Sequence, residues 1–316
     1  MTAIIITVSV ILGILAISLT VSYVCYRMAF HSPKKNQGDP HAFPNDGPYE
    51  HLRERTYNMV EALLAIPYES VFIKSHDGLT LHARYYHQKD GAPLAIGLHG
   101  YRSTSIRDFC GGGPLALDMG FNLLLVDQRA HGKSEGHAIT FGINERRDCL
   151  SWINWACKRF GSSTPIMLYG VSMGAATVLM VSGIDLPDNV RLGIADCPYS
   201  SPVAIISKVA RDMHYPARLM YPFVWLGARI FGGFNIAEMT AARAVANAKI
   251  PLMIIHGEGD DFVPSSMSDE AVTANPKIIK HTFPDAGHAL SYMYDTERYQ
   301  RLVREFISKN ISNTNI

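Results

Sequence analysis

The stretch GVSMG at residues 170–174 decides the fold, because it joins a short apolar run to a helical segment. The apolar run is Pro165–Tyr169, and Ala175–Val181 has the composition of a buried helix. A serine between two glycines can be held on a sharp strand-to-helix turn, since glycine has no Cβ atom to clash there. The N–H groups at the start of the helix would also face negative charge that develops beside the serine. The pattern indicates a candidate nucleophile at Ser172.

Short apolar runs alternate with helical segments on both sides of this stretch. The runs are Pro93–Leu98, Asn122–Val126, Pro165–Tyr169, Leu192–Ala195, Pro251–Ile255 and Ile278–Phe283. Strands that are apolar at every position are buried on both faces, and their alternation with helices is typical of a mostly parallel sheet. Ahead of them, Val71–Lys74 and Leu79–Tyr86 flank the turn sequence HDG at 76–78, which predicts an antiparallel pair. We expect one α/β domain over residues 69–316.

The last two apolar runs lead into loops whose polar residues would complete a site around Ser172. The first of these loops contains Asp260, and the second contains His288. Ligands bind at the carboxyl ends of the strands in such sheets, so the three side chains are expected to meet there. A histidine can take the proton from a serine hydroxyl, and a carboxylate can hold the ring in the required tautomer. We therefore interpret Ser172 as nucleophile, His288 as base and Asp260 as acid.

The order serine, aspartate, histidine, each after a strand, resembles the α/β-hydrolase superfamily over roughly residues 69 to 310, close to its membrane-anchored, esterase-like bacterial members. The resemblance implies the α/β-hydrolase fold and hydrolysis of carboxylic esters through an acyl-enzyme. Thioesters and small amides would use the same groups. The family's pattern of an Asp, two residues and Val-Pro falls on Asp260, with Asp261 and Asp196 as competing acids.

A second stretch, LHGYR at 98–102, resembles the His-Gly oxyanion loop of this superfamily. The resemblance assigns the backbone N–H groups of Tyr101 and Met173 to an oxyanion hole, in which one donor is worth about 3 kcal/mol of transition-state stabilisation. His99 and the segment Asp127–Ser134 are expected to have structural roles. The glycine run at 111–113 lacks the Lys-Ser/Thr of a phosphate-binding loop, and we expect a flexible break there.

Between residues 198 and 249 the alternation of strands and helices breaks. The segment is rich in aromatic and methionine side chains and stands between two expected strands, so it is interpreted as an inserted helical lid over the site. Ordinary helices packed on the sheet would have a similar composition. If the segment is a lid, its side chains favour an apolar acyl or aryl group in the substrate.

Residues 1–30 are interpreted as a transmembrane anchor. No charged side chain occurs before Arg27, and an apolar helix over residues 3–26 would be about 36 Å long, which spans a bilayer. The absence of a basic residue at the start favours a retained anchor over a cleaved signal peptide. Basic residues at Arg27, Lys34 and Lys35 predict that the domain is cytoplasmic. Residues 31–68 are expected to be a juxtamembrane linker and helix.

Composition narrows the classes of function. The net charge of +1 gives no broad basic surface, so nucleic acid is not expected as a partner. The five cysteines include no C-x-x-C pair, which indicates reduced thiols. No cofactor or metal is implied, since water and the three catalytic side chains suffice, and the expected ligand is a small acyl compound. Two alternatives are a peptidase resembling the prolyl oligopeptidase relatives and a catalytically inactive hydrolase fold that binds a partner at the membrane. The oligomeric state stays open.

Overall fold

The computed structural model describes residues 1–32, 38–43 and 47–311, and its strands form one sheet. The strands are β1 (Glu69–Lys74), β2 (Thr80–Tyr86), β3 (Leu94–Leu98), β4 (Asn122–Asp127), β5 (Ile166–Val171), β6 (Val190–Asp196), β7 (Leu252–Gly257) and β8 (Ile279–Phe283). Their order is β1-β2-β4-β3-β5-β6-β7-β8. β2 pairs antiparallel with β1 and β4, and the other pairings are parallel. The mostly parallel sheet predicted from the sequence is confirmed.

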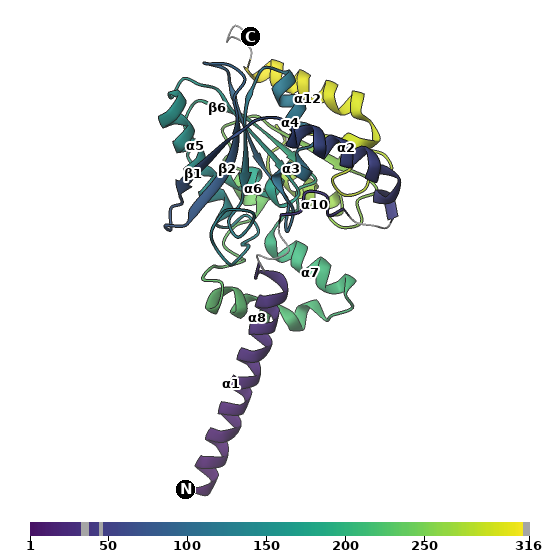
Figure 1. Cartoon of the computed structure of the whole chain (residues 1–316). Helices are drawn as coiled ribbons and strands as arrows, with labels where there is room; N and C mark the ends of the chain where they lie inside the picture. Colours follow the sequence, from purple (N-terminus) through teal and green to yellow (C-terminus); the bar gives the residue numbers. More distant parts are fainter. Residues whose placement is uncertain (33–37, 44–46, 312–316) are drawn as a thin grey trace.

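Helices cover both faces of this sheet. They are α1 (Thr2–Ala29), the 3-10 helix η2 (Gly47–Leu52), α2 (Arg53–Leu64), α3 (Ser105–Asp108), α4 (Gly112–Asp118), α5 (Glu145–Phe160), α6 (Met173–Val181), α7 (Pro202–Asp212), α8 (Ala217–Ile230), α9 (Ala241–Val245), α10 (Ser266–Ala274), α11 (Ser291–Tyr294) and α12 (Thr296–Ile311). Figure 1 shows α2, α4 and α12 on one side and α5 on the other. The arrangement is the α/β-hydrolase fold expected from the sequence.

The core lies on the two faces of the central strands. Every residue of β3, β5 and β7 is buried, which explains why their sequences are apolar throughout. On one face Phe109 and Val303 belong to a single apolar cluster, and on the other Trp152 and Val178 belong to another. Full burial of such a side chain stabilises the fold by roughly 1.5–3 kcal/mol. The five cysteines are free thiols, as the sequence indicates.

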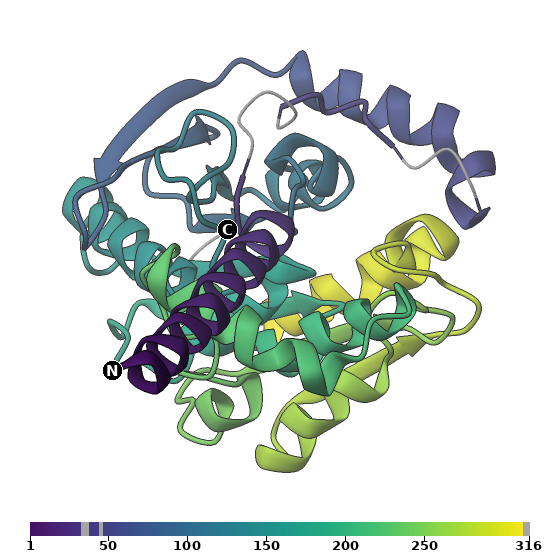
Figure 2. The same ribbon diagram turned by 90° about the horizontal axis from the view of Figure 1, so that it is seen from below.

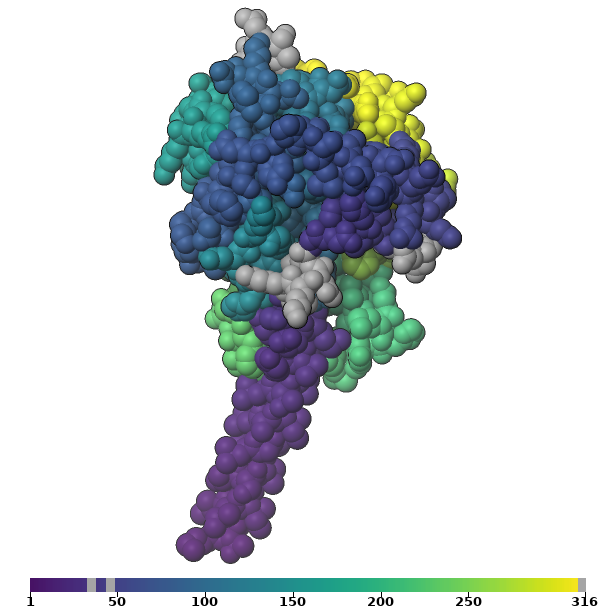
Figure 3. Space-filling model, in the orientation of Figure 1, coloured from purple at the N-terminus to yellow at the C-terminus, as the bar shows by residue number. Residues whose placement is uncertain are grey.

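Helix α1 projects from the base of the domain as a single rod (Figure 3). Its side chains are exposed along most of its length, and only the end nearest the domain is buried, at Ser22, Cys25 and Tyr26. In the part of the chain that the structure describes, α1 is the one helix long and apolar enough to cross a membrane, and a signal sequence would have the same properties. Lys34 and Lys35, two of the three charges used to predict orientation, lie outside the described residues.

The insertion expected between two strands is present as α7, α8 and α9, between β6 and β7. Helix α8 packs on the last turns of α1, and the view from below shows the two helices side by side (Figure 2). A Cβ atom at Gly227 would lie 2.4 Å from the carbonyl oxygen of Ser22, so this close approach requires glycine. The ring of Phe30 contacts Phe234 and Phe141, with centroids 5.2 and 5.8 Å apart. The end of α1 is therefore part of an apolar core.

Candidate active site

Ser172 occupies a sharp turn between β5 and α6. Its backbone has φ 54° and ψ −112°, a region that residues other than glycine rarely adopt. A Cβ atom at Gly174 would lie 1.8 Å from the carbonyl oxygen of Leu98, and one at Gly170 would lie 2.2 Å from the carbonyl oxygen of Gly174. Both glycines are therefore needed for the backbone segments to pass so closely, which explains the GVSMG sequence.

The three residues interpreted as nucleophile, base and acid meet at the carboxyl ends of β5, β8 and β7. His288 Nε2 lies 2.9 Å from Ser172 Oγ, and His288 Nδ1 lies 2.8 Å from Asp260 Oδ2. The side chain of His288 is 14% exposed and that of Asp260 is fully buried. The ring of Phe262 packs edge-on against the imidazole, with centroids 5.1 Å apart. The imidazole is thus placed to accept the serine proton while the carboxylate holds its other nitrogen.

Asp260 is held in its ionised form by its surroundings. Its Oδ1 accepts hydrogen bonds from the backbone N–H groups of Phe262 and Val263 at 3.1 and 2.7 Å. Burial opposes ionisation, but hydrogen bonds from His256, His288 and the Val263 N–H outweigh it and lower the pKa of Asp260 to about 2. The carboxylate therefore carries its charge at neutral pH and can stabilise a positive charge on the neighbouring imidazole.

The two competing acids have other partners. Asp196 Oδ2 accepts a hydrogen bond from the Tyr299 hydroxyl at 2.8 Å, and burial raises the pKa of Asp196 to about 6. Asp261 is exposed, and its backbone carbonyl accepts a hydrogen bond from Lys208. Of these three carboxylates, Asp260 is the one whose described contacts include the candidate base.

The loop after β3 lies against the serine turn. The N–H of Gly100 donates to Asp108 at 2.7 Å, and the N–H of Arg102 donates to His131 Nε2 at 3.0 Å. Tyr101 lies between these two fixed N–H groups. A Cβ atom at Gly100 would lie 3.4 Å from the Cβ atom of Ser172, so the loop backbone passes directly beside the candidate nucleophile. On the other side, the first N–H groups of α6 have no partner within the helix.

His99 and His131 hold this loop to the turn after β4. His99 Nε2 accepts from the N–H of Gln128 at 3.1 Å, and His131 Nδ1 lies 2.9 Å from the carbonyl oxygen of Arg129. Both rings are buried, and burial is the main cause that lowers the pKa of His131 to about 3. Each ring is therefore neutral and structural, in agreement with the expectation for His99 and for the segment 127–134.

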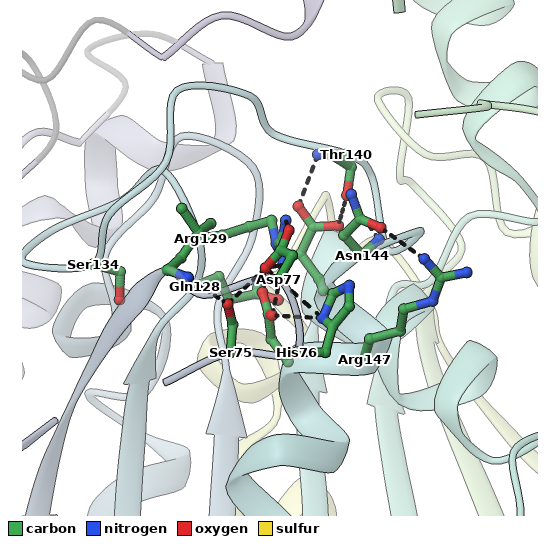
Figure 4. Close-up of polar contacts among 12 residues, drawn as sticks. Ser75, His76, Asp77, Gln128, Arg129, Ser134, Thr140, Asn144 and Arg147 are labelled. Carbon is green, nitrogen blue, oxygen red and sulfur yellow. Dashed lines mark hydrogen bonds and ion pairs between the residues drawn. The ribbon is translucent and has the colours of Figure 1, made fainter. Parts of the chain in front are cut away.

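An arginine also fixes the turn after β4. The guanidinium of Arg129 makes paired hydrogen bonds to Asp148, at 2.6 and 2.7 Å, and to Asp77, at 3.0 and 3.1 Å. Figure 4 shows Arg129 and Asp77 pointing toward each other, with His76 beside them. The spacing of His76, Asp77 and Asp148 alone would suit a metal ion. Because the guanidinium already donates hydrogen bonds to both oxygens of each carboxylate, we interpret the cluster as structural.

The glycine run at 111–113 is packed and not the flexible break expected from the sequence. Helix α4 begins at Gly112. A Cβ atom at Gly111 would lie 2.6 Å from the ring of Tyr292, and one at Gly112 would lie 2.7 Å from the ring of Tyr169. The glycines therefore let two tyrosine rings lie against the start of the helix.

A cavity of about 450 Å³ adjoins the candidate catalytic residues. More than half of the residues around it are apolar or aromatic, among them Phe43, Tyr49, Leu52, Met59, Cys110, Tyr169, Leu290, Tyr292 and Met293. They come from η2 and α2 with the preceding residues, from the loop before α4, from β5 and from the segment after β8. Among the described residues, none from 198–249 lines this cavity. The segment expected to form a lid over the site therefore does not line the cavity.

The contribution of η2 and α2 to the site was missed by the sequence analysis. The Tyr49 hydroxyl donates a hydrogen bond to the carbonyl oxygen of His288 at 3.0 Å. Arg55 donates to the carbonyl oxygen of Met293 at 2.9 Å and to Thr296 Oγ1 at 2.7 Å. The available signal was the helical spacing of Leu52, Thr56 and Met59, which predicts a helix face but not the surface that it covers.

Comparison with known proteins identifies the family to which the chain belongs. The sequence profile of the Prolyl oligopeptidase family matches residues 117–314, which is well over half of the chain. The chain belongs to this family. Its match covers the strand–turn–helix around Ser172 and the loops that carry Asp260 and His288. The first strands and the residues of η2 and α2 precede the match.

Three individual relatives each share less than 30% sequence identity with the chain. The protein YqkD of Bacillus subtilis is 26% identical over 196 residues, which cover 61% of this chain and 64% of YqkD. Human Protein ABHD12B is 29% identical over 248 residues, covering 71% of this chain and 63% of ABHD12B. The aligned part thus spans less than two thirds of either relative. Among solved structures, the Pyrococcus furiosus esterase Pf2001 aligns with a TM-score of 0.64 and 26% identity, over 80% of this chain and 95% of Pf2001.

Proposed function

We propose that the chain hydrolyses carboxylic esters through an acyl-enzyme, with Ser172 as nucleophile, His288 as general base and Asp260 as the supporting acid. The observation that carries the proposal is the imidazole of His288 between Ser172 Oγ and Asp260 Oδ2, at 2.9 and 2.8 Å. The likeness of the fold to an esterase, Pf2001, supports ester hydrolysis at a general level. Thioesters and small amides could react with the same groups.

Each of these groups would perform one part of the reaction. His288 Nε2 takes the proton of the Ser172 hydroxyl as Oγ attacks the carbonyl carbon, and then returns it to the leaving alkoxide. The backbone N–H groups of Tyr101 and Met173 stabilise the oxyanion, and each is worth about 3 kcal/mol in the transition state. Water then attacks the acyl-enzyme by the same route and releases the carboxylic acid. The side chains need no cofactor for this sequence of steps.

The size and lining of the cavity support a substrate whose acyl group is apolar and binds in the cavity. Its volume of about 450 Å³ and its aromatic and aliphatic lining suit a hydrocarbon or aryl chain. Because the cavity adjoins Ser172 and His288, an acyl chain inside it would place its carbonyl carbon beside Oγ.

Peptide hydrolysis is a second candidate, favoured by the match to the Prolyl oligopeptidase family. A peptide bond would use the same nucleophile, but His288 would then have to protonate an amine as it leaves. Comparing an ester and an amide with the same acyl group separates the two candidates, because both form the same acyl-enzyme.

The test uses the full chain in detergent with a fluorophosphonate probe and p-nitrophenyl esters of increasing acyl length. We expect the probe to label Ser172 and esters to be hydrolysed, and Ser172→Ala to lose both while it stays folded. Asp260→Asn should lower kcat by about 10⁴-fold, as loss of the tautomer-fixing carboxylate does in such triads. Asp196→Asn is the matched control and should retain most of the activity. An active Ser172→Ala protein would refute the mechanism.

We further propose that α1 is retained and crosses a membrane, with the domain on the cytoplasmic side. The support is its length of 28 residues, its exposed apolar side chains and the basic residue Arg27 at its end. Resistance of the protein to extraction by alkaline carbonate tests the anchor, and the mass of the mature chain tests whether the segment is retained. A mature chain that lacks α1 would show that the segment is a signal sequence.

A further inference from the structure

The surface of α7 and α8 around the exit of α1 is both apolar and basic. Five large apolar side chains of this region are exposed by between 37% and 71%: Met213, Tyr215, Leu219, Trp225 and Ile230. Arg211, Arg218 and Arg229 belong to the same segment of the chain and are also exposed. None of the salt bridges found in the described part of the chain involves these three arginines. Isolated exposed apolar residues are common, but a cluster beside an apolar helix indicates a binding surface.

The position of α8 along α1 matches the edge of a bilayer. A helix needs about 20 residues to cross a hydrocarbon core of about 30 Å. Residues 2–21 of α1 have about this length, and they precede Ser22, where the backbone of α1 lies directly against Gly227 of α8. The rings of Tyr23 and Phe231 are in contact there, with centroids 5.1 Å apart. Figures 1 and 3 show α7 and α8 at the base of the domain, around the point where α1 emerges.

We propose that α7 and α8 lie in the headgroup layer of the bilayer that α1 crosses, and that their arginines bind anionic phospholipids. The inference rests on the proposed membrane crossing of α1, but it does not depend on the catalytic mechanism. Tryptophan and tyrosine are enriched at the level of lipid headgroups because one part of each ring is apolar and another is polar. Arginine side chains extend from the same level toward phosphate groups.

The composition of α8 fits this placement. Arg218, Pro222, Trp225 and Arg229 follow one another at helical spacing, and all four are exposed. The opposite face, with Val224 and Ala228, is buried against the end of α1 and its apolar cluster. A helix with one face on protein and an aromatic, basic face outward is typical of an element that lies in the plane of the membrane interface.

Trp225 provides a direct probe of this placement. The chain has three tryptophans, and Trp152 and Trp155 belong to α5, away from α1 and α8 in Figure 1. We would reconstitute the full chain in nanodiscs in which part of the phosphatidylcholine is brominated, either near the headgroup or near the chain end. Tryptophan emission should be quenched more by the shallow bromine than by the deep one. Trp225→Phe should abolish this quenching, and the matched control Trp155→Phe should keep it.

A charge reversal tests the contribution of the arginines. In nanodiscs that contain phosphatidylserine, the double variant Arg218→Glu with Arg229→Glu should lose shallow quenching of Trp225, because the anionic headgroups repel the two introduced glutamates and keep α8 away from them. Arg301→Glu, on the exposed side of α12, is the control and should show no change. If the unaltered protein co-elutes with the nanodisc, which reports that α1 is inserted, and its Trp225 is not quenched, the placement of α7 and α8 is refuted while the anchor stands. If the double variant keeps full shallow quenching, the binding of headgroups by these arginines is refuted.

Discussion

Two of the helical segments that pack around the sheet differ in what they cover. Residues 47–64, as η2 and α2, line the cavity beside Ser172 and His288. In residues 202–230, α8 packs against the end of α1 and α7 packs on α8, and neither helix lines this cavity. The segment closer in sequence to the candidate anchor thus shapes the site, and the insertion in the middle of the domain holds the anchor.

Specific contacts explain the difference. Arg55 and Tyr49 tie η2 and α2 to the segment after β8 that carries His288. The insertion instead offers Gly227, whose missing Cβ atom lets α8 touch the backbone of α1 at Ser22. The position of an insertion between two strands of the sheet therefore does not determine which surface of the domain it covers.

The largest effect that separates the two segments is expected from a bulky side chain in the cavity. Met59→Trp would fill part of the apolar space lined by α2, so the longest acyl group that fits should become shorter. Misfit of a hydrocarbon group in such a pocket costs about 10- to 200-fold in kcat/KM. The measurement is kcat/KM for p-nitrophenyl esters of increasing acyl length, in which short esters should be little affected.

Leu219→Trp is the matched control, since Leu219 is exposed on α8 and does not line the cavity. It should leave the whole series of esters unchanged. If Leu219→Trp shortens the preferred acyl group and Met59→Trp does not, the insertion is the true cover of the site and the comparison is wrong.

A smaller effect is expected where α8 meets α1. Gly227→Leu places atoms within 2.4 Å of a carbonyl oxygen, so the helices must separate. Overpacking of this kind costs about 1–3 kcal/mol. We expect faster amide hydrogen exchange in residues 217–230, with hydrolysis of short esters retained. Gly13→Leu, which introduces the same side chain into α1 where nothing lies within 4 Å, should leave exchange in α8 unchanged.

The central strands of the sheet could be predicted from the sequence because they are buried on both faces and therefore apolar without interruption. Most of the candidate site could be predicted in the same way, since Ser172 and Asp260 each follow such a strand and the glycines at 170 and 174 are required by close backbone contacts. His288 instead follows β8, an edge strand that carries polar residues and is only partly buried. These features depend on short segments of the sequence, each made of one strand and the turn that follows it.

The surfaces that cover the site could not be predicted, because they depend on contacts between distant segments. The aromatic residues of 198–249 have the same composition whether they meet substrate, sheet or α1. The role of Tyr49 depends on one hydrogen bond to a backbone carbonyl 239 positions away, and the residues around Tyr49 in the sequence do not indicate this contact. For the same reason the glycine run at 111–113 was expected to be flexible, although tyrosine rings from distant elements pack on it.

The smallest effect is expected from the hydrogen bond between η2 and the candidate base. Tyr49→Phe removes the hydroxyl that donates to the His288 carbonyl and keeps the ring in the cavity wall. A neutral hydrogen bond is worth about 1 kcal/mol, so kcat for a short ester should fall about fivefold with KM unchanged. Burial raises the pKa of Tyr49 to about 12, so the phenol stays protonated and the ratio of the two rates should be constant up to pH 10. Tyr215→Phe, on the exposed turn before α8, should have no effect; a ratio that changes with pH would mean that Tyr49 acts through its own ionisation and not by positioning the histidine.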